Sequence, residues 1–121
     1  MIGLCKSPLD TNESDRDARH RRWQESVLPG LDPKIARYVD ELHANGVFTI
    51  ESCQGGDGHA YAEPTIKFSG GRHEGFRALA LALERRWPVQ RIDRSWTISD
   101  GEPEGPRWLM VFWPSAIRGS R

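Results

Sequence analysis

The stretch "VFTIESCQGGDGHAYAEPTIKF", residues 47–68, places a glycine-rich loop between two strand-like segments. Residues 47–52 are mainly β-branched and aromatic, and residues 65–68 alternate between polar and apolar side chains, so both segments are typical of β-strands. The loop between them contains one cysteine, three glycines and a histidine flanked by two carboxylates, and it closes with Glu63 and Pro64. The stretch therefore predicts a strand–loop–strand unit.

A helix is expected just before this unit. Asp32 followed by Pro33 is typical of a helix start, because an aspartate side chain can accept the free amides of the first turn and proline loses nothing there. Apolar side chains then recur on one face, at Ile35, Val39 and Leu42. Asn45-Gly46 supplies a left-handed stop, so the helix is expected to end there.

The second half of the chain repeats this order. Residues 73–87 have helical apolar spacing, closed by Pro88, and residues 89–99 and 107–114 are expected to be long strands joined by the turn-rich segment 100–106. The elements of the body thus run α-β-β-α-β-β. This order predicts an α+β fold, with an antiparallel or mixed four-stranded sheet and two helices on one face. The last strand is apolar on both faces, which indicates a central position or a face used for self-association.

Length and composition favour one compact domain. The 121 residues suit a single domain, which we place at residues 31–117, after a polar N-terminal arm at 1–30 that is partly disordered or ordered by a partner, and before a tail at 118–121. Five tryptophans in so short a chain favour a homo-oligomer. The 17 basic and 17 acidic residues balance, so the whole protein carries no nucleic-acid-binding signature.

The expected location is the cytoplasm, with no membrane association. No apolar run is long enough to span a bilayer, and the first 30 residues lack the pattern of a signal peptide. The two cysteines, Cys5 and Cys53, are expected to be free thiols.

The glycine-rich loop is the candidate ligand site. Small residues after a strand let successive backbone amides curl around an anion, and here the candidates are Ser52, Cys53, Gln54, Gly55 and Gly56. The loop matches neither a Walker motif nor a dinucleotide fingerprint. The alternative is a hairpin loop that binds nothing.

Two other roles for the loop, a cysteine nucleophile and a metal site, have weaker support in the sequence. Cys53 with His59 as its base would suit a nucleophile, and Cys53, His59 and Glu63 could bind a metal ion. Their spacing matches no recognised zinc motif, so we expect no catalytic residue, no metal site and no cofactor. In a ligand site His59 would contribute to binding, and Glu63 would accept a hydrogen bond from a ribose hydroxyl or a base edge.

A local excess of positive charge follows the loop. Residues 67–94 contain seven basic and three acidic side chains. Arg94 and Trp96 share one face of the expected strand, an arrangement that can hold a phosphate and a ring. Alternatively, Trp96 packs in the core and Arg94 covers its rim. Arg72, beside the start of the second helix, could also meet an anion.

The order "SCQGG", "AEPTIKF", "GFRALALAL" resembles the wybutosine-synthesising tRNA methyltransferase family, in which a Ser-Ser-Cys-Ser-Gly-Arg loop precedes a Glu-Pro strand and an Ala/Leu-rich helix. The resemblance covers about residues 47–85. Ser52, Cys53 and Gly55 match the loop, and Glu63 and Pro64 match the strand start, but Gly56 stands where that family has arginine. The chain is also similar to small proteins of bacteria and their phages that carry an "ESC-x-GG…GHA…EP" core. The resemblance implies a related scaffold with a ligand loop.

These features favour a non-catalytic protein that captures a small anionic, nucleotide-like ligand. If the protein is encoded by a phage, it could sequester a host nucleotide signal of immunity. The alternatives are an RNA methyltransferase-like enzyme that uses S-adenosylmethionine, a cysteine-dependent activity, and an inhibitor that binds a protein through the last strand and the N-terminal arm.

Overall fold

The structure, a computed structural model, describes residues 8–118, so Cys5 and residues 119–121 of the expected tail lie outside it. The chain divides into two units, Met1–Gly30 and Leu31–Arg121. In the first unit, helix α1 spans Pro8–Ser26 and is followed by the 3₁₀ turn η1, Leu28–Gly30. None of the helices that the structure describes is long and apolar enough to cross a membrane.

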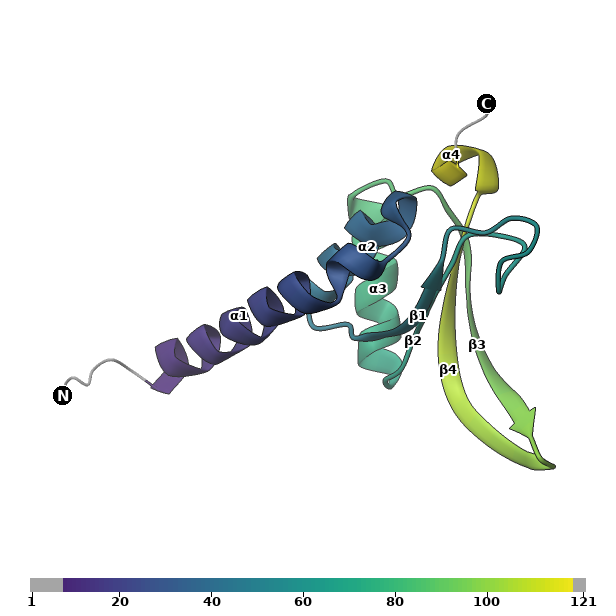
Figure 1. Cartoon of the computed structure of the whole chain (residues 1–121). Coiled ribbons are helices and arrows are strands. Elements are labelled where there is room, and N and C mark those ends of the chain that lie inside the picture. Colours follow the sequence, from purple (N-terminus) through teal and green to yellow (C-terminus); the bar gives the residue numbers. More distant parts are fainter. Residues whose placement is uncertain (1–7, 119–121) are drawn as a thin grey trace. The chain divides into compact units, whose positions relative to one another are not determined.

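The second unit contains the sheet (Figure 1). Its elements are α2 (Pro33–Ala44), β1 (Thr49–Cys53), β2 (Thr65–Phe68), α3 (Arg72–Glu84), β3 (Val89–Ser99), β4 (Glu102–Phe112) and α4 (Pro114–Arg118). The strand order is β1-β2-β4-β3, and every neighbouring pair is antiparallel. The α+β prediction is confirmed, with a fully antiparallel sheet. Strand β4 is central, which accounts for its two apolar faces.

Helices α2 and α3 cover one face of the sheet. Trp108 and Phe112 lie four residues apart on β4 and therefore share a face. The ring of Tyr38 in α2 packs 4.8 Å from that of Phe112, measured between centroids. A Cβ atom added to Gly75 in α3 would lie only 2.3 Å from Trp108. Gly75 is thus the residue that lets α3 approach this face of the sheet.

The core lies between this face and the helices. Its fully buried large side chains include Ile66 and Phe68 from β2, Met110 and Phe112 from β4, and Ile35, Val39 and Leu42 from α2. All three apolar positions that predicted the first helix are therefore core residues. Gly46, with φ +86°, follows α2 at the expected stop.

The hairpin turn is shorter than expected. The sequence predicted a connection over residues 100–106, but the two strands meet at Asp100 and Gly101, and β4 begins at Glu102. Asp100 and Gly101 both have positive φ, which suits a tight two-residue turn. Pro103 and Pro106 are tolerated because this part of β4 pairs only with β3 and leaves its other edge open.

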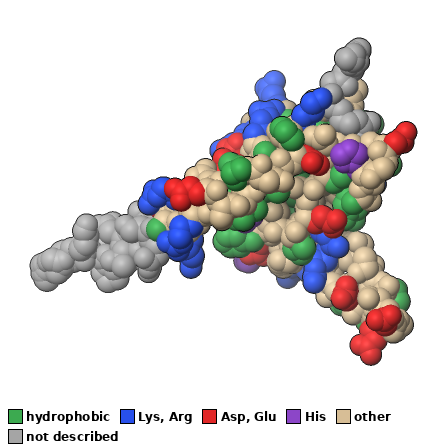
Figure 2. Space-filling view, in the orientation of Figure 1, with side chains coloured by type: hydrophobic (Ala, Val, Ile, Leu, Met, Phe, Trp, Pro, Cys, Tyr) green, Lys and Arg blue, Asp and Glu red, His purple; other side chains and the backbone are tan. Residues whose placement is uncertain are grey.

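The outer half of the β3–β4 hairpin projects beyond strand β2. Its tip carries the exposed carboxylates of Asp100, Glu102 and Glu104, and Figure 2 shows acidic side chains gathered there. Trp96 and Ile98 on β3 are 59% and 71% exposed. The hairpin therefore ends as a two-stranded acidic arm.

Helix α3, which was expected at residues 73–87, is also shorter than predicted. It ends at Glu84 rather than near residue 87, because Arg86 adopts the left-handed conformation with φ +55°. The N–H of Trp87 donates to the carbonyl oxygen of Ala82, and the N–H of Arg86 donates to that of Leu83. This pair of bonds is a Schellman motif, which closes the helix before Pro88. Helix α4 was not predicted.

Candidate functional site

Several backbone N–H groups of the loop between β1 and β2 donate hydrogen bonds to acceptors within the same segment. The N–H of Gly56 donates to the carbonyl oxygen of Ala62 at 3.0 Å, and that of His59 donates to the carbonyl oxygen of Gly56 at 3.1 Å. The N–H of Gly55 donates to Cys53 Sγ at 3.4 Å. Gly55 and Gly56 have φ values of +84° and +118°, which non-glycine residues rarely adopt. These amides are therefore committed in the conformation described.

Asp32 does not cap helix α2 with its side chain, contrary to the sequence-based expectation. Its carbonyl oxygen accepts the N–H groups of Ile35 and Ala36, which begins the helix. Its carboxylate turns to the loop instead, where Oδ2 accepts the N–H of Gln54 at 2.9 Å. The anion that meets the amide of Gln54 is thus the chain's own aspartate, 22 residues away in sequence.

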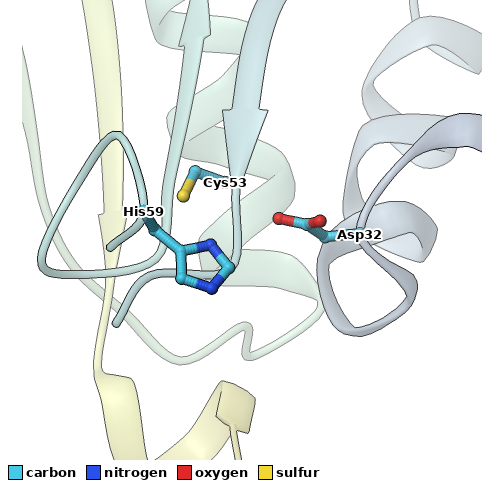
Figure 3. Close-up of side chains that lie close together, drawn as sticks. All are labelled: Asp32, Cys53 and His59. Carbon is cyan, nitrogen blue, oxygen red and sulfur yellow. The ribbon is translucent and has the colours of Figure 1, made fainter. Parts of the chain in front are cut away.

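Asp32, Cys53 and His59 form a side-chain cluster. One potential ligand atom from each residue (a carboxylate oxygen, Sγ and a ring nitrogen) lies within 4.8 Å of the other two. Figure 3 shows the three side chains pointing toward one another from three separate segments. Cys53 is 5% exposed, whereas His59 is exposed on the loop and Asp32 is half-buried. We call these residues the Asp–Cys–His cluster.

The Asp–Cys–His cluster has the donor set of a zinc site. Thiolate sulfur, imidazole nitrogen and carboxylate oxygen all bind Zn²⁺, and catalytic zinc sites use three protein ligands with an open fourth position. The amides of Gln54 and Gly55 donate to the carboxylate and to the sulfur respectively. Such bonds stabilise anionic ligands and fix their orientation. Among residues 17–117, whose side chains the structure describes, no fourth histidine, cysteine or carboxylate joins the cluster at the same spacing.

A nucleophilic role for Cys53 fits the same cluster less well. A catalytic thiolate needs access to substrate as well as a nearby proton acceptor. Cys53 is only 5% exposed, so a substrate has little access to its thiol. The geometry thus favours metal coordination over nucleophilic attack.

Tyr61 and Glu51 border the Asp–Cys–His cluster. The hydroxyl of Tyr61 donates to Glu51 Oε1 at 3.1 Å. Burial of the phenol raises the pKa of Tyr61, and the charge of Glu51, this hydrogen bond and the proximity of Cys53 raise the pKa further. Tyr61 therefore responds to charge at the cluster and can report on it.

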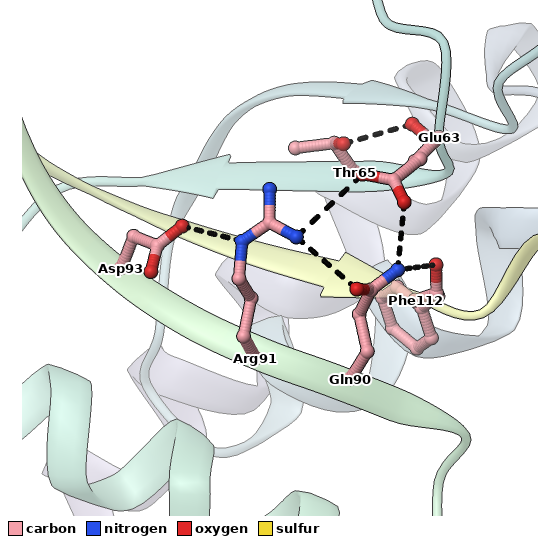
Figure 4. Close-up of polar contacts among 6 residues, drawn as sticks. All are labelled: Glu63, Thr65, Gln90, Arg91, Asp93 and Phe112. Atoms are coloured by element: carbon pink, nitrogen blue, oxygen red, sulfur yellow. Dashed lines mark hydrogen bonds and ion pairs between the residues drawn. The ribbon is translucent and has the colours of Figure 1, made fainter.

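Glu63 lies outside the Asp–Cys–His cluster, although the sequence suggested it as a metal ligand or a ligand contact. Its Oε2 accepts a hydrogen bond from Gln90 Nε2 at 2.9 Å, and its Oε1 lies 3.6 Å from Arg91 Nη1. Arg91 also donates to Asp93 at 2.8 Å (Figure 4). Glu63 thus ties the end of the loop to β3.

The basic and aromatic candidates lie elsewhere. Arg94 stacks over Trp108, with Cζ 4.9 Å from the ring centroid, and both residues align with Phe68. Cys53 instead pairs with Thr65, three residues from Phe68 along β2 and hence on the opposite face of the sheet. The structure therefore separates Arg94 from the loop.

Trp96 is exposed on the hairpin arm rather than packed in the core. Arg72 is exposed at the start of α3, near Gly70 and Gly71, whose carbonyl oxygens accept the indole N–H of Trp108. Neither residue is brought to the loop by a contact in the structure. The predicted site residues thus fall into two groups: those of the loop between β1 and β2, and Arg72, Arg94 and Trp96, which lie away from it.

Two further loop candidates have buried polar atoms without hydrogen-bond partners among the described residues, namely Ser52 Oγ and Gln54 Oε1. Ser52 aligns with Ile66 and so faces the helices. Ser52 therefore lies on the opposite face of the sheet from Cys53, its sequence neighbour, which belongs to the Asp–Cys–His cluster.

The sequence analysis missed Asp32 as a site residue. Asp32 was recognised, but only as the start of a helix. An Asp-Pro pair looks the same in the sequence whether the carboxylate caps the helix or turns toward another segment. Only the packing of α2 beside β1 decides this. Comparison with protein-family models, curated proteins and solved structures gives no match to this chain, and the methyltransferase resemblance stays a prediction.

Proposed function

We propose that the chain is a metal-dependent binding protein, which holds a zinc ion through Asp32, Cys53 and His59 and uses the ion to capture a small anionic ligand. The observation that carries this proposal is the meeting of three different donor atoms within 4.8 Å. The sulfur, nitrogen and oxygen atoms come from three separate segments of the chain, so they meet only because the tertiary fold brings these segments together. A glycine-rich turn that binds nothing would not need such an arrangement.

The spacing is compatible with zinc after small side-chain movements. Zinc bond lengths of about 2.0–2.3 Å in a tetrahedral site imply distances between ligand atoms of about 3.3–3.6 Å. The cluster spans up to 4.8 Å, so its ligand atoms need to close by about 1 Å. His59 is exposed on a loop with three positive-φ glycines, and its side chain can make this adjustment.

A metal ion also offers an anion a binding partner that four of the loop amides do not. The amides of Gln54, Gly55, Gly56 and His59 all have partners within the chain, so an anion at these amides would have to displace a bond that the chain already makes. Zinc bound by three protein ligands keeps a fourth position for water or for an anion. Because the thiolate and the carboxylate balance the charge of Zn²⁺, the anion would bind by direct coordination rather than through a net positive field.

Cobalt substitution tests the metal site. In a Cys5→Ser background, metal-free protein titrated with Co²⁺ should bind one ion and show a sulfur-to-cobalt charge-transfer band and the intense d–d bands of tetrahedral Co²⁺. Cys53→Ser should abolish the charge-transfer band. Removing a residue that only orients a metal ligand typically weakens metal binding by roughly 10- to 100-fold. Asp32→Asn and His59→Ala each alter a ligand itself, so each should weaken Co²⁺ binding by at least that factor.

Glu63→Gln is the matched control, since this loop carboxylate lies outside the Asp–Cys–His cluster and binds Gln90 and Arg91. Unchanged Co²⁺ binding is expected. The metal proposal fails if the Co²⁺ protein shows no thiolate band, or if Glu63→Gln weakens binding as much as Asp32→Asn does.

The ligand class has a separate test. Inorganic phosphate and adenosine monophosphate, added to the Co²⁺ protein, should shift the d–d bands, and calorimetry should show binding only when the metal is present. If Co²⁺ binds through Cys53 but neither probe changes the spectrum, the metal site stands and capture of a phosphate-bearing ligand is wrong.

A further inference from the structure

Helix α3 exposes an apolar stripe on the side away from the core. Phe76, Leu79 and Leu83 are 62%, 40% and 70% exposed, and Ala80 between them is also exposed. The opposite side of the helix is buried and consists of Gly75, Ala78, Leu81 and Ala82. An amphipathic surface helix normally presents polar side chains to water, so a second apolar stripe indicates a partner.

The charges beside this stripe are self-complementary. Arg77, near the middle of α3, and Glu84, its last residue, are exposed and seven residues apart, so they lie on the same flank of the helix. Within the chain, Arg77 Nη1 donates to the carbonyl oxygen of Asn45 at 3.3 Å, and Glu84 Oε1 lies 3.5 Å from Arg85 Nη1. A two-fold axis perpendicular to the helix brings the same flank of two copies together in opposite directions. Arg77 of each copy then meets Glu84 of the other.

We propose that α3 is the dimerisation helix, and that it pairs antiparallel with α3 of a second copy of this chain. Leu79 and Ala80 lie near the centre of the 13-residue helix, so they would meet at the two-fold axis. Phe76 of one copy would then contact Leu83 of the other. The small side chain of Ala80 lets the helices approach closely at the crossing point.

The chain's own polar helix fits this stripe poorly. Helix α1 has the sequence "PLDTNESDRDARHRRWQES", in which the apolar positions Leu9, Ala18 and Trp23 do not recur at helical spacing. It therefore offers no apolar stripe to match that of α3. A second copy of α3 carries such a stripe, and in the antiparallel orientation its flanking charges lie opposite charges of the other sign.

The size of the contact limits its strength. Helix α3 is about 20 Å long at 1.5 Å per residue, and one helix per copy buries less than the roughly 800 Å² per partner of a standard stable interface. A dimer with a dissociation constant in the micromolar range is expected. Sedimentation-velocity measurements should therefore span protein concentrations from below to above that range.

Matched glutamate substitutions test the surface. Leu83→Glu places a charge in the stripe and should weaken the dimer by about tenfold or more. Ile98→Glu, on the hairpin arm, is the control, because Ile98 is exposed to nearly the same extent, 71% against 70%, but lies outside α3. Ile98→Glu should dimerise like the wild type, and circular dichroism should show that both variants are folded.

A charge exchange tests the orientation. Arg77→Glu and Glu84→Arg should each weaken the dimer, and the double variant should recover wild-type association, because the contact is restored with its signs reversed. The proposal is overturned if the wild type is monomeric throughout, if Leu83→Glu and Ile98→Glu have equal effects, or if the double variant associates no better than the single ones.

Discussion

Asp32 Oδ2 accepts the backbone N–H of Gln54 at 2.9 Å, and this bond joins the start of helix α2 to the loop after β1. The two residues are 22 positions apart in sequence. The bond directs the carboxylate toward Cys53 and His59 instead of toward the first turn of α2. One hydrogen bond thus contributes both to the fold and to the Asp–Cys–His cluster.

Loss of this acceptor should destabilise the metal-free protein. Asp32→Ala leaves the N–H of Gln54 unpaired, and a hydrogen bond to a charged group contributes about 1.5–3 kcal/mol. Asp32→Asn keeps an oxygen acceptor and should cost less. Urea denaturation in the presence of a chelator measures both free energies of unfolding. Equal losses for the two variants would show that the hydrogen bond does not matter.

Gly75→Ala should lower stability although alanine favours helices. The new Cβ would lie 2.3 Å from Trp108, and overpacking of this kind costs about 1–3 kcal/mol. Gly30→Ala is the control, since nothing lies within 4 Å of the added Cβ and the backbone has no positive φ. Thermal unfolding of both variants checks the prediction. A Gly75→Ala protein more stable than wild type would contradict the packing of α3 on β4.

Glu74 should titrate below the ordinary range of a glutamate. Its Oε1 accepts the N–H of Gly71 at 2.8 Å, and this bond is the main cause that lowers the pKa of Glu74. A lowered folded-state pKa means that the contribution to stability is present above the unfolded-state pKa and is lost as the pH falls through the folded-state pKa. NMR titration of the Glu74 carboxyl group measures this directly.

The matching stability comparison uses Glu74→Gln. Its difference in melting temperature from wild type should be largest at neutral pH and should disappear at acidic pH. A pH-independent effect of Glu74→Gln would assign the loss to side-chain packing instead of charge.

Tyr61 should ionise at higher pH than an ordinary tyrosine. Its pKa is raised by burial first, and then by the charge and hydrogen bond of Glu51. The neutral phenol therefore stabilises the fold below the unfolded-state pKa, and this contribution is lost as the pH rises through the folded-state pKa. Ultraviolet titration, with Tyr61→Phe to assign the signal, measures the pKa. Glu51→Gln should lower it.

Zinc should lower the pKa of Tyr61 as well, because a cation at Cys53 favours the phenolate nearby. This response does not depend on any ligand of the metal. In Cys53→Ser protein, zinc should leave the pKa of Tyr61 unchanged. A zinc effect that persists in that variant would place the ion away from the Asp–Cys–His cluster.

Much of the fold follows from local sequence patterns. Strand β2 and the extent of β3 were predicted to the residue, and the helix-plus-hairpin order that leads to an antiparallel sheet was correct. These elements carry strong local signals, namely β-branched and aromatic strands, helical apolar spacing and an Asn-Gly stop. The tight turn at Asp100 was hidden, because the prolines after it resemble a loop unless the open edge of β4 is known.

The site was less predictable than the fold. Sequence analysis identified the loop and the proximity of Cys53 and His59, which are six residues apart. It considered Glu63 as their conceivable third metal ligand, because Glu63 lies in the same loop, and treated Asp32 only as a helix start. The pairing of Arg94 with Trp108 was equally hidden, because a cross-strand contact depends on register.

The sequence by itself determined the elements and their order, because apolar periodicity and turn residues act within a few positions along the chain. Only the tertiary structure decided which side chains meet. The packing of α2 beside β1 brought Asp32 to Cys53, and the strand register placed Arg94 on the opposite face from the loop. Contacts between distant segments depend on how helices pack and strands align, and no local pattern specifies either.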